Sequence, residues 1–587
     1  MKLIQIFRDK NMRLLYIWVE DYKCFKNAEM NFDATPRYHF DFKTRQLIES
    51  EDVYPSLFPL NEEDAIDNIS VIVGNNGSGK TSIASLLHFI LFYHGNKVNY
   101  IFIFENKKEK CLYTNIGKEI KTNLKFSENN FINSFNILYY SPHYNADSHF
   151  GTFASNGSVL FKDISTSGLM EEDLEEYKNP KTTIDYHYKY DVDKKAANSI
   201  LDNERCISFI SKLDKLDKKQ FILGITLPQK LMFSVDMNQL YKFEAECPEN
   251  SKLSDMYYSL QQNLNNNSPK ELFIDLFLLA MLCNFSTTYL FKDGVGIEKE
   301  IIDIFINAIE TGINKDKKTT KDKLINIFQE LAHPSKPQKI RINTDKAVAR
   351  LKLIDFLDGL DSKYFQEEYL VFDIPDSERI SQFYNLYKYI EGTTGFISSR
   401  FFPIISSGEK SELLMYSRIM YGLSRLNVND SNNKTVLIFL DEAEITLHPQ
   451  LQQHLINNMI IFLNTFYKDT GYKFHIIFAT HSPILLSDIP ASNVIFLEKK
   501  IGSTTTYVKE NKKQTFASNI YQLFNDSFFL DTTPIGDFAR KLIQSAIDDI
   551  NECYENPNKT VSDNTKKIVN LIGEPVFRNI LEDRIKK

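Results

Sequence analysis

Two kinds of apolar spacing divide this chain. Short continuous apolar runs, typical of strands buried on both faces of a sheet, occur near its start and near its end, at Leu14–Val19, Val71–Val73, Val436–Leu440 and Phe474–Phe478. Between about residues 165 and 395, apolar residues instead recur every three or four positions, as in helices that pack by one face. Helices are predicted there at Cys206–Leu216, Lys270–Cys283, Ile297–Ala308, Lys321–Leu331 and Ala347–Leu360. The spacing therefore predicts an α/β protein in which a mainly helical insertion splits a strand-rich unit.

The changes in spacing give four segments. Residues 1–165 and 396–540 are predicted to form the two halves of one sheet-containing unit, with residues 166–395 as the helical insertion between them. The helices of the insertion are short and lack a sustained heptad repeat, so a long coiled-coil arm is not expected. Residues 541–587 form a tail, for which a final helix is predicted at Pro575–Ile585.

A glycine-rich sequence follows the apolar run at Val71–Val73 and precedes helical spacing from Thr81 to Phe92. It matches the pattern G-x-x-x-x-G-K-[ST] of a phosphate-binding loop, and both flanks fit that motif. In such a loop backbone N–H groups surround the phosphates, Lys80 reaches the β- and γ-phosphates, and the Thr81 hydroxyl coordinates magnesium. The motif predicts nucleoside triphosphate binding by Gly74, Asn75, Asn76, Gly77, Ser78, Gly79, Lys80, Thr81 and Ser82.

A second small-residue turn, Ser406-Ser407-Gly408-Glu409, precedes an amphipathic helical stretch. Ser406 or Ser407 is predicted to be the N-cap of this helix, with Glu409 in its first turn. A capping box alone would look similar. The order of the motifs favours a functional reading, because an apolar strand that ends in two carboxylates follows it in the chain.

Those two carboxylates are Asp441 and Glu442, at the end of Val436–Leu440. This is the arrangement of a Walker B segment, in which we expect Asp441 to hold magnesium and Glu442 to polarise the attacking water as general base. The next apolar strand leads to His481. Ligands of open parallel sheets bind beyond the carboxyl ends of the strands, so we expect His481 to face the γ-phosphate.

With these motifs in this order, the chain resembles the ABC-type ATPases, in the AAA-family branch that holds SMC-like repair ATPases, OLD proteins and many bacterial antiphage ATPases. The resemblance covers residues 12–160 and 396–540 and implies an ATPase head with a mixed and parallel sheet that binds ATP and Mg²⁺. It makes Ser406–Glu409 the signature motif and His481 the switch histidine. In this family the signature of one subunit contacts the γ-phosphate held by another. Ser407 and Gly408 are therefore expected to act in trans, in a homodimer or higher even oligomer.

The sequence Asp441–Pro449 is similar to the OLD branch and differs from transporter heads. The stretches Phe516–Phe529 and Ile572–Pro575 resemble the ATPase subunit of Septu-type or retron-associated antiphage systems. The chain after His481 is too short for the Toprim nuclease domain of OLD enzymes, so the effector is expected in another chain, such as a nuclease. The resemblance implies a dimeric, ATP-hydrolysing sensor of antiphage defence. The alternatives are an SMC-like repair ATPase that binds duplex DNA directly and an ATP-bound scaffold with little turnover.

Two details of the nucleotide site stay open in the sequence. Tyr22, Phe25 and Tyr38 are candidates to stack on adenine, although the sequence favours a core position for each of them. A strand is predicted at Asn136–Ser141, after which the resembling family places a glutamine loop. No glutamine follows here, and the candidates to replace it are His143 and Asn145, unless His143 is simply a loop residue.

The composition limits the other partners. A formal net charge of −8 is not the basic excess of a protein that coats nucleic acid. The candidates for local DNA contact are three lysine-rich stretches, Lys315–Lys323, Lys336–Lys352 and Lys499–Lys513. Such stretches are usually only solvated surface. The six cysteines include no C-x-x-C pair, so a disulfide framework or zinc site is not expected.

Nothing in the sequence predicts membrane contact. The longest apolar run, Leu276–Cys283, is too short to span a bilayer. The apolar start Met1–Phe7 is followed at once by Arg8–Lys10 rather than by a small-residue cleavage site, so it does not match a secretion signal. A cytoplasmic protein is expected.

Overall fold

A computed structural model describes most of the chain between residues 12 and 586. The described residues are 12–51, 54, 57–92, 98–106, 109–116, 120–126, 136–145, 150–155, 158–178, 194–215, 224–236, 252–264, 268–290, 299–314, 319–333, 344–390, 395–426, 434–499, 502–509, 514–527, 536–556 and 559–586.

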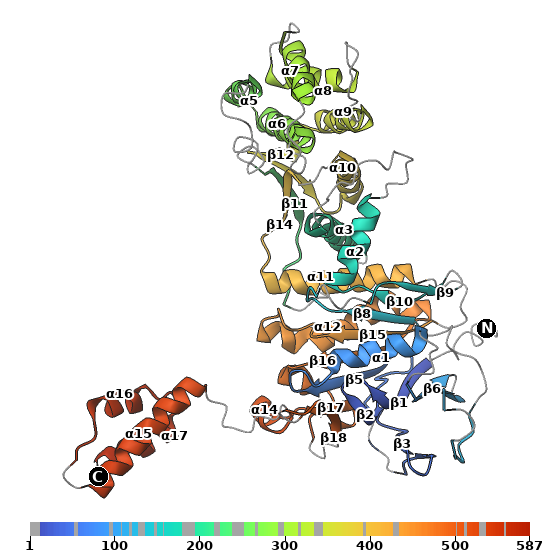
Figure 1. The fold of residues 1–587 in the computed structure, drawn as a ribbon, viewed down its shortest axis with the longest axis vertical. Helices are drawn as coiled ribbons and strands as arrows, with labels where there is room; N and C mark the ends of the chain where they lie inside the picture. Colours follow the sequence, from blue (N-terminus) through green and yellow to red (C-terminus); the bar gives the residue numbers. More distant parts are fainter. Residues whose placement is uncertain are drawn as a thin grey trace.

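The head of the protein is built on one twelve-stranded sheet (Figure 1). Six neighbouring strands at its centre, from β17 to β10, run parallel, and the strands beyond them pair antiparallel except for a parallel pairing of β18 with β2, which confirms the predicted α/β class with a mixed sheet. In spatial order the strands are β7 (Glu109–Thr114), β6 (Tyr100–Asn106), β1 (Met12–Tyr22), β2 (Phe25–Asn31), β18 (Thr506–Lys509), β17 (Val494–Lys499), β5 (Ile66–Gly74), β16 (Lys473–Thr480), β15 (Thr435–Asp441), β8 (Asn136–Tyr140), β10 (Ser158–Asp163) and β9 (Phe153–Ser155).

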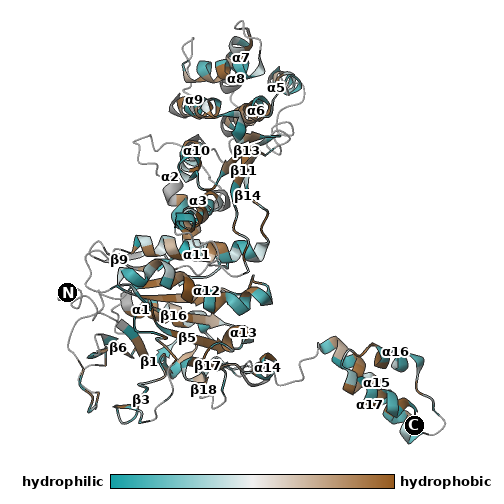
Figure 2. Cartoon of the chain, turned by 180° about the vertical axis from the view of Figure 1, so that it is seen from behind, coloured by the Kyte–Doolittle hydropathy of each residue, from teal (hydrophilic) through white to brown (hydrophobic). Residues whose placement is uncertain are grey.

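Helices cover both faces of the central strands. Helix α1 (Lys80–Phe92) packs on one face with Leu437 and Phe439 of β15, whereas Ile438 belongs to the core on the other face. That second face is covered by α11 (Ser407–Arg425) and α12 (Pro449–Tyr467). Because both faces are buried, the central strands need continuous apolar runs rather than alternation. Figure 2 shows this as mainly hydrophobic strands inside the head.

The arm projects from the α11 side of the head (Figure 1). Its base holds α2 (Thr166–Lys178) and α3 (Lys194–Lys215), followed by an antiparallel sheet in the order β12 (Phe365–Gln366), β13 (Tyr369–Asp373), β11 (Lys230–Val235) and β14 (Ile397–Phe402). The outer part contains α5 (Lys252–Gln262), α6 (Pro269–Leu290), α7 (Lys299–Asn314), α8 (Thr320–Ala332), α9 (Thr344–Gly359) and α10 (Ser377–Ile390). Strand β14 then returns the chain to the head, directly before α11.

Helix α6 explains the longest apolar run of the sequence. Its residues Phe277–Cys283 are all buried, because neighbouring elements of the arm surround the helix. None of the helices in the described part of the chain is both long and apolar enough to cross a membrane.

The remaining elements lie at the edges of the head and in the tail. A hairpin of β3 (Tyr38–Asp41) and β4 (Gln46–Glu49) packs on β1. The short helices α13 (Pro483–Leu486) and α14 (Ile520–Ser527) follow β16 and β18. In the tail, α15 (Asp537–Glu555), α16 (Asp563–Leu571) and α17 (Pro575–Lys586) pack around a small core of their own.

Candidate active site

The predicted motifs meet at one edge of the sheet. Val73 of β5 is in register with Thr480 of β16, and Ala479 of β16 with Asp441 of β15. The carboxyl ends of these parallel strands are therefore level, and β8 ends beside them because Leu440 pairs with Tyr140. Each strand is followed by a segment with polar side chains. The fold thus brings together residues that lie far apart in the sequence.

The phosphate-binding loop runs from the end of β5 to the start of α1 and depends on its glycines. Gly77 and Gly79 have φ values of +71° and +95°, a region that favours glycine. A Cβ atom at Gly79 would lie 2.4 Å from Cys24 Sγ, and one at Gly74 would lie 2.4 Å from the Leu497 carbonyl oxygen. The loop backbone is packed so closely on β2 and β17 that larger residues would displace it. Asn76, Gly77 and Thr81 are exposed, so the loop's outer side is open to a ligand.

Lys80 is buried at the first position of α1. Its Nζ lies 3.2 Å from the Gly74 carbonyl oxygen and 2.5 Å from His481 Nε2. Burial lowers the pKa of Lys80, while the carboxylates of Glu442, Asp441 and Glu444 oppose that shift. The lysine is thus held between the loop and the end of β16, where its charge can meet a bound phosphate.

Asp441 has the surroundings of a magnesium ligand. Its Oδ2 accepts hydrogen bonds from the Thr81 hydroxyl at 2.7 Å and from the Tyr139 hydroxyl at 3.0 Å. Its Oδ1 is buried and accepts no hydrogen bond from the described residues. Burial raises the pKa of Asp441, and the two hydroxyls oppose the shift. A hydroxyl and a carboxylate with a free oxygen suit Mg²⁺, which is bound by few protein groups together with substrate phosphates.

No group of three or more histidine, cysteine or acidic side chains within the described ranges could hold a metal ion. Magnesium sites of nucleotide-binding proteins usually combine one or two protein ligands with phosphate oxygens and water, and Thr81 and Asp441 would supply the protein ligands here.

Glu442 lies between two imidazoles. Its Oε1 is 3.5 Å from His481 Nε2 and its Oε2 is 3.2 Å from His143 Nε2. The residue has a φ of +51°, which is uncommon for a side chain other than glycine, and its N–H donates to the Ala479 carbonyl at 2.8 Å. Hydrogen bonding with His481 is the largest cause that lowers the pKa of Glu442, to about 2. The carboxylate is therefore ionised and directed across the end of the sheet.

Glu444 fixes the backbone that presents His481. Its carboxylate accepts hydrogen bonds from the Thr480 hydroxyl and, at 3.2 Å, from the His481 N–H. Burial raises the pKa of Glu444. Neither Glu444 nor Tyr139 was predicted as a site residue. The only sequence signal for Glu444 is that it is the third carboxylate in Asp441-Glu442-Ala443-Glu444. No local sequence pattern indicates Tyr139.

The signature residues have other neighbours in the same chain. Ser406 caps α11 in a reciprocal capping box with Glu409, which settles the N-cap of this helix. Glu409 also accepts a hydrogen bond from the Thr226 N–H at 3.0 Å. A Cβ at Gly408 would lie 3.3 Å from the Thr446 carbonyl oxygen. The signature therefore packs against the segment after Glu442 and the start of α12, while Lys80, Thr81, Asp441 and His481 contact one another.

Comparison with known proteins decides the family. The family model of the AAA ATPase domain matches residues 12–486, which include the arm, the first half of the head and the second half as far as α13. The chain belongs to the AAA ATPase domain family. No curated protein matches it. Members of this family are ATPases that generally bind ATP and Mg²⁺, which agrees with the surroundings of Lys80 and Asp441.

The structure reduces the number of candidates for adenine stacking and for the missing glutamine in this ATPase. Phe25 and Tyr38 are buried, so neither offers a face to adenine. Tyr22 is half-buried beside α1, with its hydroxyl 2.7 Å from Ser85 Oγ, and is the candidate that reaches the surface. Of the candidate glutamine replacements, His143 reaches Glu442, whereas the Asn145 backbone N–H donates to Ser167 Oγ at 2.6 Å.

The structure describes only parts of the three lysine-rich stretches. Residues 315–318, 336–343, 500–501 and 510–513 of these stretches lie outside the described residues. Arg350 is buried and lies 4.0 Å above the ring of Phe285, so it is not a DNA contact. Lys321 forms an ion pair with Asp358.

Proposed function

We propose that this protein is an ATPase in which two copies enclose ATP, and that it acts in the cytoplasm as the sensor of an antiphage defence system that controls a separate effector, such as a nuclease. The observation that carries the enclosed-nucleotide part is the division of the motifs within one chain. Lys80, Asp441, Glu442 and His481 meet at the sheet edge, whereas Ser407 lies exposed at the start of α11. A γ-phosphate held by Lys80 would need a second copy to bring Ser407 to it.

The surface around the signature supports a second copy. Two large apolar side chains directly before the signature are exposed, Phe402 by 49% and Ile404 by 77%. Ile445, on the segment that packs against Gly408, is 52% exposed. Large apolar side chains gathered beside one motif are typical of a surface that another protein covers. In a symmetric pair each copy would present this surface to the phosphate loop of the other.

The chemistry follows from the side chains at the sheet edge. Glu442 accepts the proton of a water that attacks the γ-phosphorus, as the bond to the β,γ-bridging oxygen breaks. Lys80 and His481 face the same phosphate oxygens and stabilise the negative charge on them. Thr81 and Asp441 would hold Mg²⁺, which neutralises phosphate charge when bound. ATP then favours the closed pair because Lys80, His481 and the opposing Ser407 bind its γ-phosphate together only in that state.

The proposed control of a separate effector rests on the resemblance to antiphage ATPases. When hydrolysis opens the closed pair, a partner chain bound to it would respond to the change from ATP to ADP. Co-purification with a nuclease would support this role. Salt-dependent duplex binding by the isolated protein would instead support direct DNA maintenance.

Ser407→Arg tests the enclosed nucleotide. The added side chain would obstruct the opposing phosphate loop, so we expect ATP hydrolysis and ATP-driven dimerisation to be lost while ATP affinity of the single chain stays within about threefold of wild type. Ser424→Arg is the matched control, because Ser424 is exposed near the other end of α11. Wild-type hydrolysis by Ser407→Arg would rule out a signature that acts in trans.

A further inference from the structure

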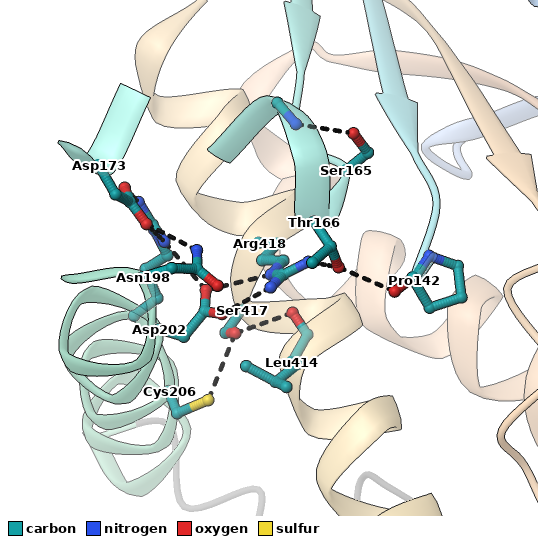
Figure 3. A network of polar contacts seen from close by, with 12 residues as sticks. Pro142, Ser165, Thr166, Asp173, Asn198, Asp202, Cys206, Leu414, Ser417 and Arg418 are labelled. Atoms are coloured by element: carbon teal, nitrogen blue, oxygen red, sulfur yellow. Dashed lines mark hydrogen bonds and ion pairs between the residues drawn. The ribbon is translucent and has the colours of Figure 1, made fainter. Parts of the chain in front are cut away.

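A buried polar network joins the base of the arm to the signature helix (Figure 3). Arg418 of α11 donates to both oxygens of Asp202 on α3, from Nη2 at 2.6 Å and from Nε at 3.1 Å. Arg205, one turn after Asp202, donates to it at 2.9 Å and also pairs with Asp173 of α2. All four side chains are at least nine-tenths buried. Since a buried charge that loses its partner is strongly unfavourable, α2, α3 and α11 are held together at this point.

Thr166, at the start of α2, connects this network to the loop after β8. Its Oγ1 accepts a hydrogen bond from Arg418 Nη1 at 2.9 Å and donates to the Pro142 carbonyl oxygen at 2.9 Å. Its backbone N–H donates to the Ser141 carbonyl oxygen at 3.0 Å. A hydroxyl has one proton and two lone pairs, so one Thr166 side chain satisfies both partners at once. Arg418 and the loop therefore share one fixed contact, as Figure 3 shows.

His143 is the residue that follows Pro142. Its imidazole lies 3.2 Å from Glu442 Oε2, on the oxygen that His481 does not approach. The loop backbone leaves this side chain half-exposed beside the end of β15. Contacts thus lead from Asp202 through Arg418 and Thr166 to the Pro142 carbonyl oxygen. The next residue in the chain, His143, then contacts Glu442.

We propose that His143 is a positioning residue for Glu442, and that Thr166 sets the place of His143 relative to the signature helix and the arm. This inference rests on the hydrolytic role proposed above. His143 limits rotation of the carboxylate, so that the water between Glu442 and the γ-phosphate is held in line for attack. A displacement of α3 or α11 moves Thr166 and with it the loop that carries His143. The position of the arm is therefore transmitted to the catalytic carboxylate.

The first test compares His143→Ala with His143→Gln. We expect His143→Ala to lower kcat on the order of tenfold with ATP affinity unchanged, because an unrestrained carboxylate aligns the water less often. His143→Gln should recover much of the rate, since its amide can donate to Glu442. In a Glu442→Gln background, His143→Ala should have no further effect on the residual rate. A wild-type kcat for His143→Ala, or equal effects in both backgrounds, would overturn the inference.

The second test is on Thr166. Thr166→Val keeps the shape but removes both side-chain hydrogen bonds, whereas Thr166→Ser keeps the hydroxyl. We expect Thr166→Val to lower kcat as His143→Ala does, Thr166→Ser to stay within about twofold of wild type, and the combination of Thr166→Val with His143→Ala to be no slower than either alone. Independent, multiplying losses would show that Thr166 does not act through His143. Circular dichroism and thermal unfolding identify a variant that has merely lost its fold. If Thr166→Val does not fold, kcat of Thr166→Ser shows whether the hydroxyl alone is enough to keep the wild-type rate.

The outcomes separate the two proposals. Hydrolysis by the wild type that Glu442→Gln abolishes and His143→Ala leaves unchanged would refute the positioning role and keep the proposed function. Absence of hydrolysis in the wild type, with ATP and Mg²⁺ supplied, would refute both.

Discussion

Glu442→Gln is expected to lower ATP hydrolysis by a factor on the order of a thousand while ATP still binds. Glutamine has nearly the same shape, but its amide cannot take the proton of the attacking water. The low pKa of Glu442, about 2, means that the wild-type side chain is ionised throughout the physiological pH range. Steady-state release of phosphate, with ATP affinity measured separately, checks both parts.

The same variant should accumulate the closed pair. When the γ-phosphate is not cleaved, the contacts that bind it across the two copies persist, and light scattering should report a larger mass with ATP than without. Glu498→Gln on strand β17, which β5 and β16 separate from β15, is the matched control and should behave as wild type. Undiminished phosphate release by Glu442→Gln would show that Glu442 is not the general base of the reaction.

Lys80→Ala is expected to weaken ATP binding on the order of a hundredfold and so to abolish hydrolysis at ordinary ATP concentrations. The variant loses a buried cation 2.5 Å from His481 Nε2, at the place where the phosphate loop closes. Two charge-assisted hydrogen bonds to the β- and γ-phosphates disappear with it. Titration with a fluorescent ATP analogue measures the loss.

Lys26→Ala provides the control for Lys80→Ala, because Lys26 is an exposed lysine of β2 that pairs only weakly with Asp21. It should retain wild-type affinity. Equal ATP affinity in Lys80→Ala and wild type would mean that the glycine-rich loop is not the nucleotide site.

The parts of the fold that could be predicted are those with a local signal. The run Val436–Leu440 predicted β15 because both faces of the strand are apolar. Strand β5 was predicted only at its end, Val71–Val73, because polar residues precede that apolar run. The strand starts at Ile66, and its buried Asn68 donates to the Phe32 carbonyl oxygen at 2.8 Å. Polar residues inside a strand can be recognised only when their distant partners are known.

The antiparallel sheet of the arm and helix α16 were not predicted for a related reason. Strand β14 contains Ser398, Ser399 and Arg400 among its apolar residues, and its partner β11 lies far away in the sequence. Helix α16 has only two buried residues, Thr565 and Val569, so its apolar pattern is weak. Tertiary contacts, rather than local spacing, determine these elements.

Within the site, the sequence predicted the residues that motifs contain and not those that support them. Lys80, Thr81, Asp441 and Glu442 occupy fixed places in known patterns. Tyr139 and Glu444 act by touching Asp441 and the His481 backbone, and such contacts depend on strand register.

The proposal that ATP is enclosed by two copies is tested most directly by mixing two inactive variants. Lys80→Ala supplies an intact signature and Ser407→Arg an intact phosphate loop, so each mixed pair has one complete site. Random pairing should restore up to about a quarter of the wild-type hydrolysis rate, because half of the pairs are mixed, each has one of its two sites intact, and the added arginine meets the opposing loop only at the other site. A rate that stays at the sum of the two separate variants, at every mixing ratio, would contradict the account.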